Sequence, residues 1–444
     1  MFRLKLVFNN LQFYLHAPEV EAPLSGCLRQ SPQRASDLRC SETFELRLEG
    51  SPTALDEWIS HMEQLLSCAH SRLHPLQLVM QPDDRGAEWF SRVLEGKLEM
   101  LGHLSADRDR GRLSLRLTLL REDFWQGDLQ AVPLSNANGS QVASGLLLYN
   151  HWDGDPGHQN WAAIGGTDVA GDLPAPAELW ISNQDDAGQR SGNIYAGHSF
   201  QVDCDQVQAL LEAENATSPQ TSSVISAADC SGGSYRQVSW NGVDEVCLLS
   251  WSISASEAAY RQGLPFRPLV RFAQAPEYND LWLNWSVRYA GEVVSSLSQL
   301  AKANQALQLL AAVYLPPVPL GEDAVCEVLT LELHARRMSG ASQTLKIDFA
   351  CLMPLDGWRQ FQPLGGQVLA DHERLVDESS EDLLYTENLT SLRRKVTHTK
   401  TGTGVWLRPG YNQWIFLLSG NGASAPVSDR LRLQVVYRPR KRVL

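Results

Sequence analysis

Residues 407–420 read LRPGYNQWIFLLSG, a turn followed at once by an apolar run. Proline fixes φ and glycine tolerates positive φ, so Pro409 and Gly410 mark a tight turn, in which the side chain of Asn412 can bond nearby backbone. The run 414–418 is rich in β-forming residues and too short for a helix. This stretch therefore predicts a turn that leads into a buried strand near the end of the chain.

A second strand pattern follows closely. Apolar residues alternate with polar ones at Leu431, Leu433, Val435 and Tyr437, which gives one buried face and one solvated face. We expect this strand to pair with 414–418 as an antiparallel hairpin that completes a β-sandwich. The basic stretch RPRKR at 438–442 comes next, and we expect it to be a solvated end that keeps the last strand soluble, with contact to an acidic partner as the alternative.

Residues 1–128 predict a small β-barrel with one packed helix. Apolar residues alternate along 2–8 and 44–48, and further strand patterns follow at 74–81, 88–101 and 111–122. Ser51 is a good N-cap and Pro52 suits the first helical position, so a helix is expected over 52–70. Its core-facing stripe at helical spacing is Leu55, Trp58, Ile59, Met62 and Leu66.

Residues 129–444 are turn-rich and predict an extended β-sandwich, so the whole chain is expected to be mainly β. Residues 214–234 have low complexity and predict a loop, and 298–317 predicts a short helix or a lead into a strand. The acidic run 371–388 is expected to be a solvated loop or rim.

Catalytic motifs are absent from the sequence. No phosphate loop, nucleophile elbow or HExxH motif occurs, so we expect no enzyme activity and no catalytic or cofactor-binding residues. The eight cysteines show no CxxC spacing, and we expect free thiols and no metal site. The net charge of −13 argues against a protein that grips nucleic acid through its phosphates. No apolar run is long enough to span a bilayer.

Thirteen tryptophans are many for a chain of this length. Trp152 and Trp161 lie in a stretch that reads as a loop between strands, where exposed rings could stack on a sugar. Packing of these rings in a core or a subunit interface is the alternative, because tryptophan dominates both environments.

Several stretches together resemble distal tail and baseplate proteins of long-tailed bacteriophages. RLTLLREDFWQGD at 116–128 resembles the end of the tube-like domain of that family, and VAGDLPAPAELWISN at 169–183 resembles a GDxPAP stretch of related tail proteins. The order of TLKIDFACLMPLDGWRQFQ, GGQVLADHERL, LRPGYNQWIFLLSG and VVYRPR resembles the C-terminal sandwich of the family. The resemblance implies that this sandwich is of the jelly-roll or galectin-like kind. The chain is longer than the simplest members of the family, chiefly between about 184 and 340, so extra loops or a second sandwich are expected there.

The resemblance implies a structural virion protein of a phage tail tip or baseplate, made in the bacterial cytoplasm. Residues 1–128 would form a homo-oligomeric ring that continues the tail tube, with six copies implied and three left open. The sandwich would dock tail-tip or receptor-binding proteins, and DNA would only pass through the lumen. A carbohydrate-binding host-adhesion module and a capsid decoration protein remain the alternatives.

Overall fold

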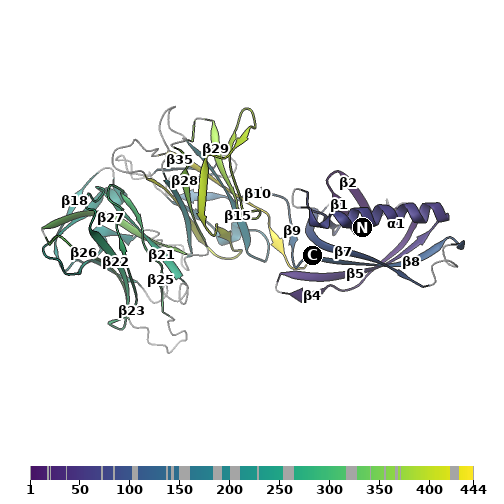
Figure 1. Ribbon diagram of the computed structural model, residues 1–444, viewed down its shortest axis with the longest axis horizontal. Helices are drawn as coiled ribbons and strands as arrows, with labels where there is room; N and C mark the ends of the chain where they lie inside the picture. Colours follow the sequence, from purple (N-terminus) through teal and green to yellow (C-terminus); the bar gives the residue numbers. More distant parts are fainter. Residues whose placement is uncertain are drawn as a thin grey trace. The chain divides into compact units, whose positions relative to one another are not determined.

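The computed structural model describes residues 2–17, 20, 22–36, 38–71, 74–83, 86–102, 109–136, 139–141, 145–149, 161–183, 193–200, 211–227, 230–253, 265–316, 328–340, 342–354, 357–365, 369–370, 372–420 and 430–443. The fold is mainly β, as the sequence predicts, and the described residues contain one α-helix (Figure 1). The chain divides into two compact units. Unit 1 comprises Met1–Gln130, Ala170–Leu173 and Arg438–Leu444, and unit 2 comprises Ala131–Val169 and Pro174–Tyr437.

Unit 1 is built on one strongly curved antiparallel sheet. Its strands follow the order β2 (Leu11–His16), β1 (Arg3–Phe8), β6 (Gln77–Gln81), β7 (Trp89–Leu101), β8 (Arg112–Glu122), β5 (Arg39–Glu49) and β3 (Leu24–Arg29). The short strand β4 (Gln33–Ser36) pairs with β5, and β9 (Trp125–Gln126) pairs with β7. The sheet forms a nearly closed barrel.

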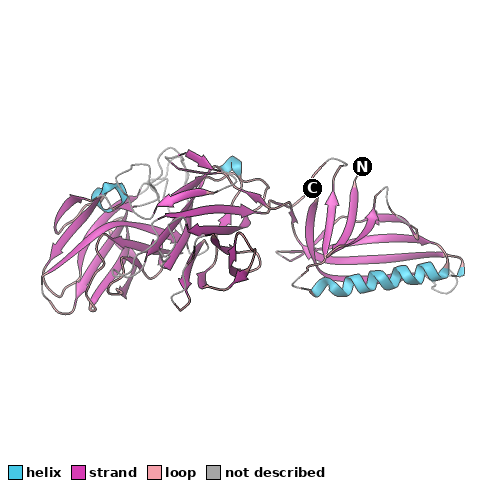
Figure 2. Cartoon of the chain, turned by 90° about the horizontal axis from the view of Figure 1, so that it is seen from above, coloured by secondary structure: helices cyan, strands magenta, loops and turns pink. Residues whose placement is uncertain are grey.

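Helix α1 (Pro52–Ser67) lies along one face of this sheet, and a 3₁₀ turn, η1 (Cys68–His70), continues it (Figure 2). Ser51 caps the helix, with its side chain accepting a hydrogen bond from the Ala54 amide at 3.3 Å. Every residue of the expected apolar stripe is buried in the core of unit 1. Helical periodicity therefore identified both the helix and the face that packs on the sheet.

A buried ion pair lies in unit 1 where the strand alternation predicts an apolar residue. Glu42 falls on the same face of β5 as Phe44 and is 0% exposed. It accepts a hydrogen bond from Arg121 of β8 at 2.6 Å and another from Arg29 of β3. The Arg121 guanidinium also lies over the Trp125 ring, 4.5 Å from its centroid. The charge is thus paired on two sides, which a buried carboxylate requires.

The end of the chain belongs to unit 1 and is not the solvated tail expected from its charge. Strand β36 (Arg440–Lys441) pairs with β9, and the Gly127 amide donates to the Pro439 carbonyl at 2.9 Å. The Arg440 guanidinium lies 4.0 Å from the centroid of Phe124, and the Lys441 ammonium lies 4.5 Å from that of Trp89. The aliphatic parts of Arg440 and Lys441 pack on aromatic rings. A high positive charge is therefore compatible with a segment that is packed against unit 1.

Unit 2 contains an outer sandwich of two sheets. One sheet has the order β10 (Gln130–Ala131), β35 (Arg430–Tyr437), β15 (Ala175–Asn183), β29 (Glu373–Glu378), β30 (Leu383–Asn388) and β31 (Arg394–Lys395), with β13 (Leu146–Tyr149) on β35 and β33 (Trp406–Leu407) on β15. The other has the order β12 (Gly139–Gln141), β11 (Leu134–Asn136), β14 (Trp161–Ile164), β34 (Gln413–Gly420), β16 (Asn193–Phe200), β28 (Trp358–Pro363) and β32 (His398–Gly402). The 3₁₀ turn η2 (Gly166–Asp168) follows β14.

The last two long strands do not form the hairpin that we expected. Strand β34 pairs with β14 and β16, whereas β35 pairs with β13 and β15 in the opposite sheet. Ile415 and Leu417 of β34 share one core with Leu431 and Leu433 of β35. Alternation specifies which side chains of a strand are buried, but it is equally compatible with pairing in one sheet and with packing across two.

A second sandwich is inserted between β16 and β28. One of its sheets has the order β18 (Thr221–Ser226), β19 (Ser234–Trp240), β27 (Gln343–Pro354), β21 (Pro265–Phe272) and β24 (Leu307–Leu309), with β17 (Leu211–Glu212) on β27 and β25 (Val313–Tyr314) on β21. The other has the order β20 (Val246–Ile253), β26 (Leu329–Arg337), β22 (Leu281–Tyr289) and β23 (Glu292–Leu300). The 3₁₀ turns η4 (Ala213–Asn215) and η5 (Ser231–Gly233) complete it. Residues 211–354 therefore have a core of their own.

Two local expectations for unit 2 were wrong, and a third is decided between its alternatives. The described part of 298–317 contains the end of β23, then β24 and β25, so it leads into strands and does not form a short helix. Low-complexity residues 221–226 form the edge strand β18. The acidic run forms the hairpin β29–β30, in which buried Asp377 pairs with Arg359 at 2.9 Å and with Lys400 at 3.3 Å. The basic side chains that pair with Asp377 come from other strands, β28 and β32, so the acidic run by itself did not show that its charge is compensated.

Among the described residues, none of the helices combines the length and the apolar character needed to cross a lipid bilayer. The described cysteines are free thiols, as expected.

Candidate functional site

The two edge strands of the unit 1 sheet meet at a seam. Strands β2 and β3 end the strand order and come close to each other without pairing. Among the described residues, each hydrogen-bonds to one neighbouring strand only, so each has an outer edge that pairs with no further strand. Leu11 on β2 and Leu28 on β3 are 67% and 63% exposed. Unpaired edges with exposed apolar side chains are templates for association with another chain.

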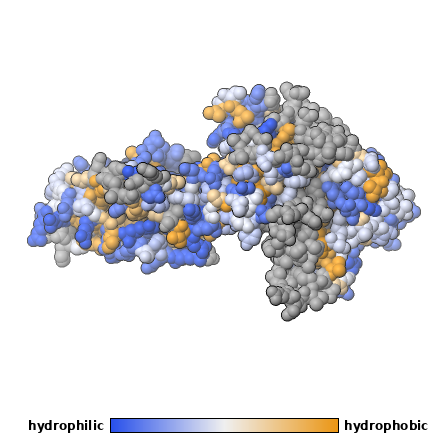
Figure 3. Space-filling model, turned by 180° about the vertical axis from the view of Figure 1, so that it is seen from behind, coloured by the Kyte–Doolittle hydropathy of each residue, from blue (hydrophilic) through white to orange (hydrophobic). Residues whose placement is uncertain are grey.

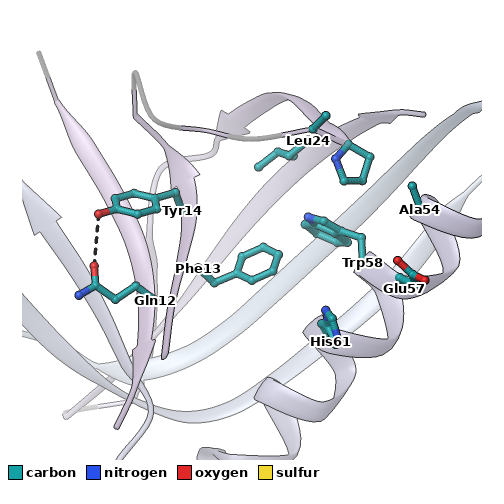
Figure 4. Close-up of a pocket in the computed structure, with 10 residues that line it drawn as sticks. Gln12, Phe13, Tyr14, Leu24, Ala54, Glu57, Trp58 and His61 are labelled. Atoms are coloured by element: carbon teal, nitrogen blue, oxygen red, sulfur yellow. Dashed lines mark hydrogen bonds between the residues drawn. The ribbon is translucent and has the colours of Figure 1, made fainter. Parts of the chain in front are cut away.

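A pocket of about 520 Å³ opens at this seam, between the two edge strands and α1 (Figure 4). Strand β2 contributes Phe13 and Tyr14, α1 contributes Trp58, and the chain at the start of β3 contributes Pro23 and Leu24. The Phe13 and Trp58 rings meet edge to face, with centroids 5.1 Å apart. Because Trp58 is only 7% exposed, its ring serves mainly as an aromatic wall that the core holds in place.

Polar groups lie around this aromatic wall. Glu57 and His61 project from exposed positions one helical turn apart on α1, and the Tyr14 hydroxyl donates to the Gln12 side chain at 3.2 Å. The arrangement suits a side chain with an apolar body and a polar or cationic tip. On the face shown in Figure 3, the described apolar residues of unit 1 form separate patches among hydrophilic surface.

The two tryptophans expected as sugar-stacking residues have different outcomes. Trp152 lies outside the described residues. Trp161 is half-buried on β14, with its ring centroid 4.2 Å from that of Trp414, and it packs against a small core cluster that includes Tyr195 and Met353. Its ring is therefore engaged in packing within unit 2, and sugar stacking stays a prediction.

Sequence reasoning did not find the seam. Strands β2 and β3 are short, and β2 places Phe13 and Tyr14 next to each other, which breaks the alternation by which half-buried strands are identified. The one available signal was the density of aromatic residues in LQFYLH at 11–16. The pocket combines three segments that are separate in sequence, so no local pattern could predict it.

Comparison with known proteins gives little further information. No family model matches the chain, and no curated protein matches it. One solved structure that it resembles weakly is the phage P2 baseplate in its activated conformation with Ca, at 8% identity and a TM-score of 0.17, covering 79% of this chain and 98% of that one. Another is the infectious bursal disease virus VP2 subviral particle, at 9% identity and a TM-score of 0.17, covering 70% and 80%. TM-scores this low do not establish a shared fold.

Proposed function

We propose that this chain is a structural protein of a phage tail tip or baseplate, in which unit 1 forms a ring and unit 2 docks other tail proteins. The observation that supports a ring most directly is the seam of unit 1, with its two unpaired strand edges and its aromatic pocket. The stretches at 116–128, 169–183 and 407–420 that resemble distal tail proteins support the tail location.

A closed ring is built from head-to-tail contacts, in which one patch on each copy binds a different patch on the next. The seam is one such patch. Helix α1 cannot supply the main contact through its apolar face, because that face is buried in the core of its own unit. The strand edges and the pocket would therefore carry the interface, and exposed Leu11, at the start of β2, would belong to it.

Passage of DNA through such a ring requires a lumen that does not bind phosphate tightly. Residues 1–128 carry 15 basic and 19 acidic side chains, a slightly negative balance that is compatible with this requirement. The arginines among them can pair with acids of a neighbouring copy, as Arg121 already does with Glu42 within one copy.

The test is the oligomeric state of the full-length protein, measured by native mass spectrometry and negative-stain imaging. We expect rings of six, and we expect Leu11→Asp to dissociate them, because it places a charge in the seam. The matched control is Leu383→Asp, which changes an exposed leucine on a strand of unit 2.

Two results would count against the proposal. One is a ring that Leu11→Asp leaves intact. The other is an image of the assembled particle in which residues 1–128 lie on the outer surface, away from the tail axis.

A further inference from the structure

A group of metal-ligating side chains lies on the inserted sandwich, on the sheet formed by β20, β26, β22 and β23. Cys247 on β20 is directly opposite His334 on β26, and Glu332 lies two residues from His334 on the same strand. Residues at these positions project from the same face of a sheet. The opposite face carries core residues such as Leu333 and Trp285, so the three polar side chains lie on the outer face.

The spacing of the three side chains suits a small ion. One ligand atom from each of Cys247, Glu332 and His334 lies within 4.8 Å of the other two. The His334 Nε2 atom is 2.8 Å from the Glu332 Oε2 atom. In a tetrahedral zinc site with bonds of 2.0–2.3 Å, ligand atoms are separated by roughly 3.3–3.8 Å. Small side-chain rotations would therefore bring these atoms to ligand positions without moving the strands.

A carboxylate that has its own hydrogen-bond partners lies beside the histidine. The Glu245 Oε1 atom lies 3.8 Å from Nδ1 of His334, on the side of the ring opposite the Nε2 atom that faces Glu332. Asn284 donates to Glu245 at 2.7 Å, and Ser296 donates to Asn284 at 2.9 Å. A carboxylate beside the second nitrogen of a histidine is the arrangement that orients histidine ligands in metal sites.

From this geometry we propose that Cys247, Glu332 and His334 bind a zinc ion that links β20 to β26, with water as the fourth ligand. A thiolate, an imidazole and a carboxylate together favour zinc, whereas calcium and magnesium prefer sites made of oxygen atoms alone. In the metal-free protein, Arg288, at 2.9 Å, and His334 both contact the Oε2 atom of Glu332.

The test is a cobalt titration of the full-length protein after chelation and removal of bound metal. Cobalt is the probe because a cobalt–thiolate bond gives a charge-transfer absorption that zinc then removes by displacement. We expect saturation at one equivalent, and we expect Cys247→Ser and His334→Gln to abolish the absorption. Glu245→Gln should weaken metal binding by roughly 10- to 100-fold. It removes the carboxylate beside the His334 ring but leaves all three ligands in place.

The control is Cys68→Ser, in which the changed thiol lies at the C-terminus of α1 in unit 1 and contacts the Gln64 carbonyl. It should leave the titration unchanged. A measurement on the unmodified protein guards against variants that fail to fold: zinc should protect Cys247 from alkylation, as read by peptide mass spectrometry. The proposal is overturned if no cobalt–thiolate absorption forms, if the absorption survives Cys247→Ser, or if zinc leaves the alkylation of Cys247 unchanged.

Discussion

At the scale of single residues, the notable features of this protein are acids that burial keeps from ionising easily. Burial raises the pKa of Glu212 to about 8 and that of Asp348 to about 7. Glu212 accepts a hydrogen bond from the Ser231 hydroxyl at 2.6 Å, and Asp348 accepts from the Ser231 amide at 2.9 Å and from Arg271 at 2.6 Å. The two acids join β17, β27 and η5 of the inserted sandwich.

These raised pKa values predict that the inserted sandwich loses stability as the pH rises. In the folded chain both acids hold their protons more tightly than in the unfolded chain, so their contribution is complete at low pH and is lost as the pH rises through about 7 to 8. Glu212→Gln keeps the shape and removes the charge. At about pH 9 we expect this variant to be more stable than the wild type, with a free energy of unfolding higher by roughly 1–3 kcal/mol and unfolding at a higher denaturant concentration.

The control for that prediction is Glu277→Gln, which changes an exposed acid of the same sandwich and should leave the pH profile unchanged. Tryptophan fluorescence during urea unfolding is a suitable measurement, because Trp251 donates a hydrogen bond to the Glu212 carbonyl at 3.0 Å. A wild-type stability that is constant between about pH 6 and 9 would contradict the assignment.

A second residue-scale prediction concerns Glu42 in unit 1. Glu42→Ala leaves the buried guanidinium of Arg121 without its carboxylate, so we expect a loss of about 3–5 kcal/mol in the free energy of unfolding. Glu49→Ala on the same strand removes an exposed partner of Arg112, 3.7 Å away, and should change stability by less than about 1 kcal/mol. Equal effects of the two changes in urea melts would show that the buried pair is not stabilising.

At the scale of elements, strand β36 connects the last residues of the chain to unit 1. Its backbone pairs with β9, and its basic side chains cover Phe124 and Trp89. Burial lowers the pKa of Arg440 to about 10, a sign that solvent around this charge is restricted. The pairing makes unit 1 discontinuous in sequence, and a fragment that ends at residue 128 lacks one of its strands.

We therefore expect deletion of residues 438–444 to destabilise unit 1, since it exposes Trp89 and Phe124 and removes the partner of β9. The measurement is amide hydrogen exchange. Exchange should become faster in β7 and β9, and it should not change in β15 and β34 of unit 2. Arg442→Ala is the matched control, because its position lies outside β36. Unchanged hydrogen exchange in β9 after the deletion would contradict the structural role that we assign to residues 438–444.

At the scale of the whole molecule, the second sandwich is inserted in the chain between two strands that are neighbours in one sheet. Strands β16 and β28 pair with each other, with Gly197 opposite Trp358, so the points where the chain leaves and re-enters the outer sandwich are adjacent. A small cluster including Tyr195, Trp358, Phe349 and Met353 joins the two sandwiches of unit 2. Domains inserted in this way are tolerated because the ends of the insertion are close together.

This topology predicts that the two sandwiches fold separately. Replacing residues 201–356 by a short glycine-serine linker would connect β16 to β28 as a hairpin, and residues 211–354 would form the other protein. We expect cooperative thermal unfolding of both by calorimetry, with the first destabilised because Tyr195 and Trp358 lose their cover. Absence of a cooperative transition in both proteins would show that the sandwiches depend on each other for folding.

The sequence by itself determined which residues are buried within an element. Helical spacing placed Leu55, Trp58 and Met62 on the core side of α1, and alternation placed Leu431 and Leu433 on the core side of β35. Both periodicities are local properties of a strand or helix, fixed by backbone geometry before any partner is present.

Only the tertiary structure decided the partners. The turn at 409–412 shows the difference: Gly410 has the positive φ that its sequence predicts, but the Asn412 side chain also accepts a hydrogen bond from the Gly166 amide, at 2.8 Å, in a segment 246 residues away. In the same way β34 joins β14 and β16 and not β35, and the pocket at the seam joins β2, β3 and α1. A strand carries the same alternation whichever neighbour it has, so pairing depends on contacts far apart in sequence, which no local pattern records.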